Sequence, residues 1–203
     1  MKVVVFGASG KTGTRVVQSA LDRDHDVTAF GRSVGRLEPA PGLNPAKGDV
    51  FDEADVLAAV TGQDAVIVCL GSVSLKDRTT LTRGTANIVQ AMSTAQVERL
   101  IVLSAAGAGS SWELIPWSSR LLFRTMLRNV IADHNAQEDV VRASDTSWTI
   151  VRAAVLSEKP GTGATEHGPD LKTTKITRDD VAAFLVDRLG NEELLRQEVN
   201  VSN

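Results

Sequence analysis

Three glycines spaced three residues apart mark the part of this sequence best suited to chemistry. Gly7, Gly10 and Gly13 lie between a short valine-rich run and a segment with a helical apolar stripe. Gly7 lets the chain turn sharply, Gly10 gives a ligand access to backbone N–H groups, and Gly13 allows a helix to pack closely. A strand, glycine turn and helix in this order typically bind the pyrophosphate of a dinucleotide at the helix N-terminus.

The whole glycine turn is therefore expected to contact phosphates. Its residues are Gly7, Ala8, Ser9, Gly10, Lys11, Thr12 and Gly13. A P-loop is a poor alternative: Gly10-Lys11-Thr12 matches the end of that motif, but Val5 stands where its first glycine is required. The alternative is a tight turn that binds no ligand.

The segment after the second expected strand (26–31) indicates which dinucleotide binds. An acidic residue there would bind the 2′-hydroxyl of the adenosine ribose and favour NAD. The chain has Arg32 and Ser33 instead, with Arg36 one helical turn further. Because a guanidinium pairs with a phosphate through two parallel hydrogen bonds, Arg32 favours NADP over NAD. The alternative is that both arginines are solvated surface charges.

The ends of the next strands supply further candidates. Asp49 and Val50 follow a short expected strand (46–48) and are placed near the adenine, although Asp49 is equally suited to a turn. The apolar run 64–70 reads as a buried strand that ends beside Gly71. Ser104 ends the strand expected at 99–104, where it either donates to a substrate carbonyl or satisfies a backbone group at the strand end.

Strands alternate with helices along the chain, which predicts an α/β fold: a doubly wound parallel sheet in three αβα layers, the Rossmann fold, in one domain over residues 1–203. Helices are expected at 14–22, 52–60 (capped by Asp52), 81–95, 118–144 and 177–189. A sixth strand is expected at 147–152 and an edge strand at 198–201. A polar loop is expected at 158–172, and the substrate side at about 105–120 and 153–175.

Composition excludes several classes of protein. The 203 residues are 42% hydrophobic and 23% charged, and the net charge of -3 does not favour a nucleic-acid partner. Cys69 is the only cysteine, so neither an internal disulfide nor a multi-thiolate zinc site can form, and no metal site is expected. Without a long apolar run or a signal-peptide pattern, we expect a cytoplasmic protein that acts on a small molecule and not on a membrane. We also expect a monomer, although no motif in the sequence addresses the oligomeric state.

With these motifs in place, the chain resembles the atypical short-chain dehydrogenase/reductase superfamily. The resemblance is to its NAD(P)H-binding proteins of NmrA-like and flavin reductase (biliverdin reductase B) type. It covers nearly the whole chain and is carried by VVVFGASGKTG (3–13), GRS (31–33), KGDVFD (47–52), DAVIVCLG (64–71), RLIVLSAAG (99–107), DHNAQEDVVRASDTSWTIVRAAVL (133–156) and ITRDDVAAFLVDRL (176–189).

The resemblance implies a role for each matching residue. Besides phosphate contacts from the glycine turn, it implies a 2′-phosphate contact from Arg32 with Ser33 nearby. It places the adenine by Asp49 and Val50, and the ribose by Leu70 and Gly71. Ser104 would face the nicotinamide, and His134 would lie beside the nicotinamide ribose.

The chain departs from the superfamily at the catalytic pair. Ordinary members use a tyrosine and a lysine four residues apart. This sequence has no tyrosine at all, and no lysine between Lys76 and Lys159. Proton donation by tyrosine is therefore excluded, and direct hydride transfer from NADPH to a planar conjugated acceptor, such as a flavin, quinone or tetrapyrrole, is favoured.

Ser104 would orient the acceptor, and His134 would hold the ribose or donate a proton, unless it is a surface histidine. Trp112 and Trp117 would form an apolar wall or pack in the core, and His167 would touch substrate from a loop. Arg152 is interpreted as structural. The main alternative is a non-catalytic dinucleotide sensor of NmrA-like type. A nucleotide-sugar epimerase is disfavoured, because such enzymes usually need the tyrosine and a larger C-terminal domain.

Overall fold

A computed structural model describes residues 1–72, 74–114 and 125–203. The strands are β1 (Lys2–Phe6), β2 (Asp26–Gly31), β3 (Leu43–Lys47), β4 (Ala65–Val68), β5 (Arg99–Ala105), β6 (Ser147–Ala153), β7 (Val155–Ser157), β8 (Glu166–Gly168), β9 (Lys175–Thr177) and β10 (Gln197–Ser202). The α-helices are α1 (Gly13–Leu21), α2 (Glu53–Val60), α3 (Thr80–Ala95), α5 (Arg128–Arg142) and α6 (Arg178–Asp187). Two 3₁₀ turns are η1 (Val34–Arg36) and η2 (Gly109–Leu114).

Eight strands form one sheet in the order β3-β2-β1-β4-β5-β6-β10-β8. All neighbours in it run parallel except β8, which is antiparallel to β10. The order 3-2-1-4-5-6 is that of a dinucleotide-binding Rossmann fold, so the predicted fold class is confirmed. The short strands β7 and β9 pair separately.

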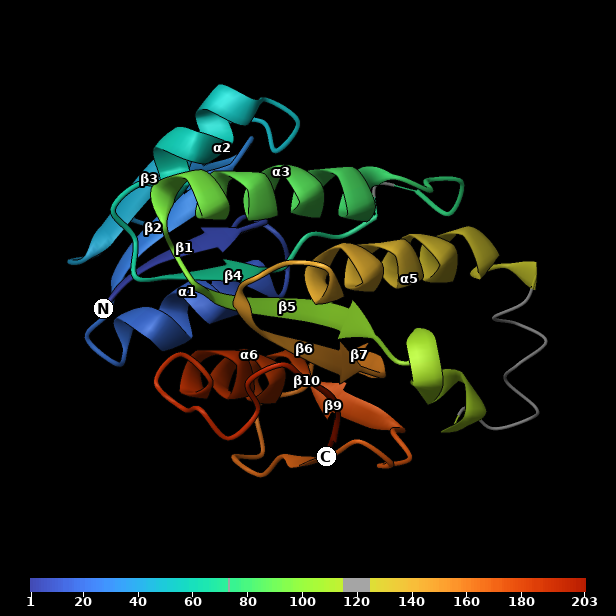
Figure 1. The fold of residues 1–203 in the computed structure, drawn as a ribbon. Helices are drawn as coiled ribbons and strands as arrows, with labels where there is room; N and C mark the ends of the chain where they lie inside the picture. Colours follow the sequence, from blue (N-terminus) through green and yellow to red (C-terminus); the bar gives the residue numbers. More distant parts are fainter. Residues whose placement is uncertain (73, 115–124) are drawn as a thin grey trace.

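Helices cover both faces of the sheet. Figure 1 shows α2, α3 and α5 over one face and α1 and α6 over the other. Successive side chains of a strand point to opposite faces. Val4 and Phe6 of β1 therefore join the core under α2 and α3, while Val3 and Val5 join the core under α1 and α6. None of the helices in the described residues is long and apolar enough to cross a membrane.

Two helices begin at caps that fix their position. As the sequence predicts, Asp52 caps α2: its carboxylate accepts hydrogen bonds from the backbone N–H groups of Ala54 and Asp55 at 2.9 and 3.0 Å. Helix α3 is capped from another helix instead. The buried carboxylate of Asp133 in α5 accepts from the N–H groups of Leu81 and Thr82 at 2.9 and 3.0 Å. This contact locks the start of α3 to α5.

The structure corrects three predicted elements, the edge strand, the polar loop and the short third strand. β10 is not an edge strand, because β8 pairs with it inside the segment expected to be a polar loop. β3 starts at Leu43 rather than Ala46 and contains Pro45, which an edge strand tolerates because one side of its backbone needs no partner. Of the helix expected at 118–144, α5 accounts for Arg128–Arg142, and residues 118–124 lie outside the described residues.

Candidate functional site

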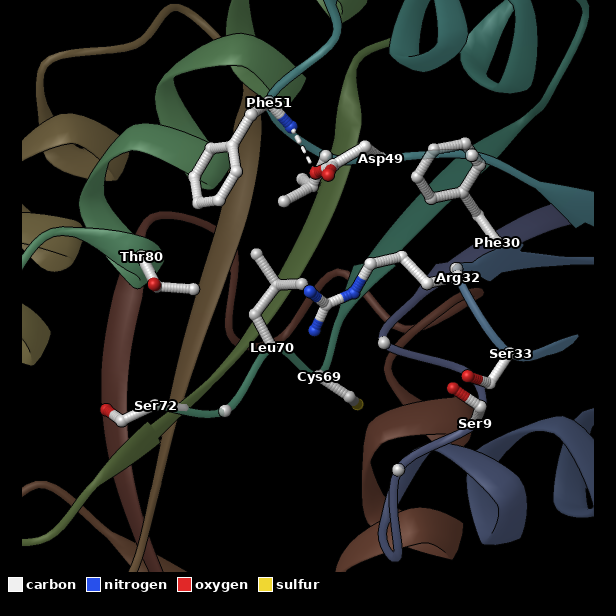
Figure 2. A pocket seen from close by; sticks show the side chains of 16 residues that line it. Ser9, Phe30, Arg32, Ser33, Asp49, Phe51, Cys69, Leu70, Ser72 and Thr80 are labelled. Carbon is white, nitrogen blue, oxygen red and sulfur yellow. Dashed lines mark hydrogen bonds between the residues drawn. The ribbon is translucent and has the colours of Figure 1, made fainter. Parts of the chain in front are cut away.

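A cavity of about 370 Å³ opens at the carboxyl ends of β1, β2 and β4 (Figure 2). Nine residues predicted to bind the cofactor line it: Gly7, Ser9, Gly10, Arg32, Ser33, Asp49, Val50, Leu70 and Gly71. These residues come from loops that are separate in the sequence, and parallel strands bring the loops to one edge of the sheet. In such sheets, ligands bind outside the carboxyl ends of the strands.

The glycine turn is shaped by close backbone approaches. Gly7 has φ +79°, and a Cβ there would lie 2.5 Å from the carbonyl oxygen of Cys69. A Cβ on Gly13 would lie 2.1 Å from the carbonyl oxygen of Gly7, which is far inside van der Waals contact. Gly13 therefore permits α1 to start against the turn, as the sequence indicates. Ala8 is fully buried beneath this turn.

The N-terminus of α1 suits an anionic group. Its N-cap, Thr12, makes no side-chain capping hydrogen bond, and the first turn carries no acidic residue. The partial positive charge of the helix end is therefore not offset locally. The side chains of Lys11 and Thr12 point elsewhere: Lys11 pairs with Glu158 at 3.3 Å, and the Thr12 hydroxyl accepts from Arg178 at 2.7 Å.

Arg32 extends into the cavity from the end of β2 (Figure 2). It is exposed, and within the described residues it forms no ion pair. Its neighbour Ser33 lines the same cavity, whereas Arg36 does not. A free guanidinium at this place is available to an incoming phosphate.

Asp49 fulfils the turn role that the sequence left open. Its carboxylate accepts from the N–H of Phe51 at 3.0 Å (Figure 2), while its own N–H donates to Asp55 at 3.0 Å. Asp49 also lines the cavity, so turn formation and a place near a ligand coexist at this residue.

Sequence reasoning missed several residues that line the cavity. They are Phe30, Gly31, Gly48, Phe51, Cys69, Ser72 and Thr80. Most are next in sequence to a residue predicted to bind the cofactor, so extending each predicted loop by one residue would have included them. Thr80 carried no such signal, because it enters from the start of α3. The Cys69 thiol is inert here, since burial raises its pKa to about 12.

A second group of polar side chains gathers where β5 meets α5. The hydroxyl of Ser104, which is 3% exposed, donates to Oε1 of Glu138 at 2.7 Å. Nδ1 of half-buried His134 lies 3.4 Å from the same hydroxyl oxygen. Ser104 and His134 are thus brought together, although they do not line the cavity described above. Val68 of β4 pairs with Val102 of the parallel strand β5. Leu70 and Ser104 each lie two residues after that pair, so both follow it at the same carboxyl edge of the sheet.

Glu138 anchors this group by pairing with two arginines. Arg152 donates to both of its carboxylate oxygens, at 2.9 and 2.7 Å, and Arg142 donates to Oε2 at 2.7 Å. Both arginines also bond Glu198 on β10. Burial alone would lower the pKa of Arg152, but hydrogen bonds and charge from Glu138 and charge from Glu198 outweigh it and raise the pKa. Arg152 therefore has the structural role read from the sequence.

Burial lowers the pKa of His134 from its ordinary value, against opposing contributions from Glu138, Gln137 and Asp133. At neutral pH the imidazole is accordingly neutral, with one nitrogen protonated and the other free to accept. The position is neither a fully exposed surface site nor a core site.

Two of the three predicted substrate residues are described, and they lie on different elements. Trp112 is half-buried in η2, and Trp117 lies outside the described residues. His167 packs on Phe184 of α6, with ring centroids 5.2 Å apart, beyond β10 and on the side of the sheet opposite α5. Among the described residues, no group of three or more His, Cys, Asp or Glu side chains could hold a metal.

The sheet order, the glycine turn and the cavity define a dinucleotide-binding α/β protein. The family described as NAD(P)H-binding matches residues 7–192, and the chain belongs to that family. "Uncharacterized sugar epimerase YhfK" of Bacillus subtilis is 30% identical over 200 residues, which cover 93% of this chain and 88% of that protein.

Solved structures share the fold at low sequence identity. A short-chain dehydrogenase/reductase from Veillonella parvula, solved in complex with NADP, superimposes with a TM-score of 0.85 at 20% identity. The match covers 100% of this chain and 94% of the Veillonella chain. ChuY, an anaerobilin reductase from Escherichia coli O157:H7, has a TM-score of 0.80 at 20% identity, with 100% and 97% covered. These neighbours share the fold of this chain, and the Veillonella protein was solved with NADP bound.

Proposed function

We propose that this protein is an NADPH-dependent reductase that transfers a hydride to a planar conjugated acceptor of flavin, quinone or tetrapyrrole type. The observation that carries the proposal is the cavity at the glycine turn, into which Arg32 extends without an ion-pair partner among the described residues. Membership of the NAD(P)H-binding family supports the cofactor class. The preference for NADP over NAD rests on Arg32.

The residues present fit the cofactor. The uncapped N-terminus of α1 suits the pyrophosphate, Arg32 and Ser33 suit a 2′-phosphate, and the loop at Leu70 and Gly71 leaves room for a ribose. When bound, the dihydronicotinamide supplies the hydride with its electron pair. The chain itself binds and orients the cofactor.

Acceptors of this chemistry fit a site without the Tyr/Lys pair. Conjugated rings take up a hydride readily, and their heteroatoms can receive a proton from solvent or from a weak donor. Ser104 and His134 are the polar groups at the end of β5, and the half-buried Trp112 follows the same strand. The fold shared with an anaerobilin reductase agrees with a tetrapyrrole-like acceptor.

The test has two stages on the purified protein. NADPH and NADH are titrated first, and NADPH oxidation is then followed with FMN, a quinone and a biliverdin, each against a control without enzyme. Tighter binding of NADPH than NADH, with turnover of any acceptor, supports the proposal. Tight binding without turnover supports a dinucleotide sensor instead, and the absence of dinucleotide binding would refute both functions.

A further inference from the structure

The direction of the hydrogen bonds around Ser104 follows from the groups it meets. A hydroxyl has one proton to donate. Glu138, paired with the guanidinium groups of Arg152 and Arg142, offers only acceptor oxygens, and the contact from Ser104 to Oε1 is short at 2.7 Å. The proton of Ser104 is therefore committed to Glu138. Ser104 cannot at the same time donate to a substrate carbonyl, which removes the donor role that its position at the strand end suggested.

The same argument extends one residue further, to His134. With its proton directed at Glu138, the Ser104 oxygen can only accept from Nδ1 of His134, 3.4 Å away. A neutral imidazole that donates from Nδ1 carries no proton on Nε2. The two hydrogen bonds that link Glu138, Ser104 and His134 therefore run in one direction. His134 donates to Ser104, and Ser104 donates to the buried carboxylate of Glu138.

We propose that Glu138 is a positioning residue that acts through Ser104: it holds the proton of neutral His134 on Nδ1 and leaves Nε2 as an acceptor for a hydroxyl of the bound ligand. The ribose of a dinucleotide carries hydroxyls of this kind. The ligand part of the inference rests on the proposed function, whereas the tautomer belongs to the ligand-free protein and is tested separately.

Glu138 and Glu198 form a matched pair for this test. Both lie against Arg142 and Arg152, and both lose the same charge on conversion to glutamine. Only Glu138 contacts Ser104. A structural role shared by the arginine cluster would make Glu138→Gln and Glu198→Gln alike, while the proposed role affects Glu138→Gln alone. Ser104→Ala breaks the chain of hydrogen bonds without changing any charge, so it serves even where Glu138→Gln fails to fold.

Nitrogen-15 NMR of the histidine rings at about pH 8, above the ordinary imidazole pKa, reads the tautomer directly. The chain has only three histidines, so His25→Gln and His167→Gln assign the signals. We expect mostly Nδ1–H for His134 in the wild type and in Glu198→Gln, and loss of that majority in Ser104→Ala and Glu138→Gln. A wild-type majority of Nε2–H would overturn the proposal, as would equal shifts in both glutamine variants or an unchanged tautomer in Ser104→Ala.

Titration of NADPH into the same variants tests the ligand part. Because one neutral hydrogen bond is lost, Ser104→Ala is expected to weaken binding about three- to tenfold, with Glu198→Gln close to the wild type. Unchanged affinity in Ser104→Ala, together with the expected change of tautomer, would refute the hydroxyl contact and leave the tautomer argument intact. If the wild type binds no dinucleotide, the proposed function fails and the NMR result still stands.

Discussion

Replacing Arg32 by alanine should separate the two nicotinamide cofactors. A hydrogen bond to a charged group contributes about 1.5–3 kcal/mol. Arg32 is exposed at the mouth of the cavity, where water screens the charge, so the lower end applies. About 1.4 kcal/mol is a tenfold change in affinity. We therefore expect Arg32→Ala to raise the Kd of NADPH about tenfold and that of NADH less than about twofold.

Isothermal titration of both cofactors into wild type and variant measures the two ratios. Arg36→Ala is the matched control, because Arg36 is a neighbouring exposed arginine that does not line the cavity. Its loss should leave both affinities unchanged. Equal weakening of NADPH and NADH binding by Arg32→Ala would refute the contact with the 2′-phosphate. If Arg36→Ala weakened NADPH binding as much as Arg32→Ala, the effect would come from positive charge in general and not from Arg32.

Substitutions at three further positions test the scaffold. Gly13→Ala places a Cβ 2.1 Å from a carbonyl oxygen, so α1 must shift; we expect a loss of about 1–3 kcal/mol in urea unfolding and weaker NADPH binding, and a variant as stable as wild type would contradict the packing. Asp133→Ala leaves the first N–H groups of α3 without their acceptor, which should cost roughly 3 kcal/mol by the urea midpoint, while Asp133→Asn, which keeps an oxygen, should cost less. Hydrogen bonds from Thr162, Thr177 and Gly163 outweigh burial and lower the pKa of Asp180 below 3.8, so its contribution to stability is present above that pH and is lost as the pH falls through the folded pKa. Acid unfolding of Asp180→Asn should show a smaller loss of stability over this range, and an equal loss would exclude the contribution.

The cofactor half of the fold is predictable because its signals are local. The strand, glycine turn and α1 are contiguous, and this segment itself contains the positive φ of Gly7 and the close approach of Gly13 to the Gly7 carbonyl. Arg32 follows β2 directly, and the ends of parallel strands necessarily meet at one edge. The other half of the fold is harder to predict from the sequence, because its strands pair with partners that are distant along the chain. β8 has three residues and no apolar alternation, so nothing in its sequence places it beside β10.

The polar chain behind Ser104 was also beyond sequence reasoning, although one signal existed. Arg152 lies one residue before the end of a strand that carries no other charged residue, and a charged residue there must be paired if it is buried. The sequence does not say that its partner is Glu138, since helix and strand meet only in the folded protein. The direction of the hydrogen bonds, and with it the proposed role of Ser104 between Glu138 and His134, required the distances.

The two edges of the large sheet are poor templates for a further strand. At one edge, β3 contains Pro45, which has no N–H to offer, and ends at Lys47, whose charge opposes a neighbouring apolar strand. At the other edge, β8 is only three residues long. The buried centre of this sheet is rich in valine and isoleucine. With unprotected edge strands, such a sheet could pair with strands of other molecules. The margins of this sheet should therefore protect the protein from aggregation by strand addition.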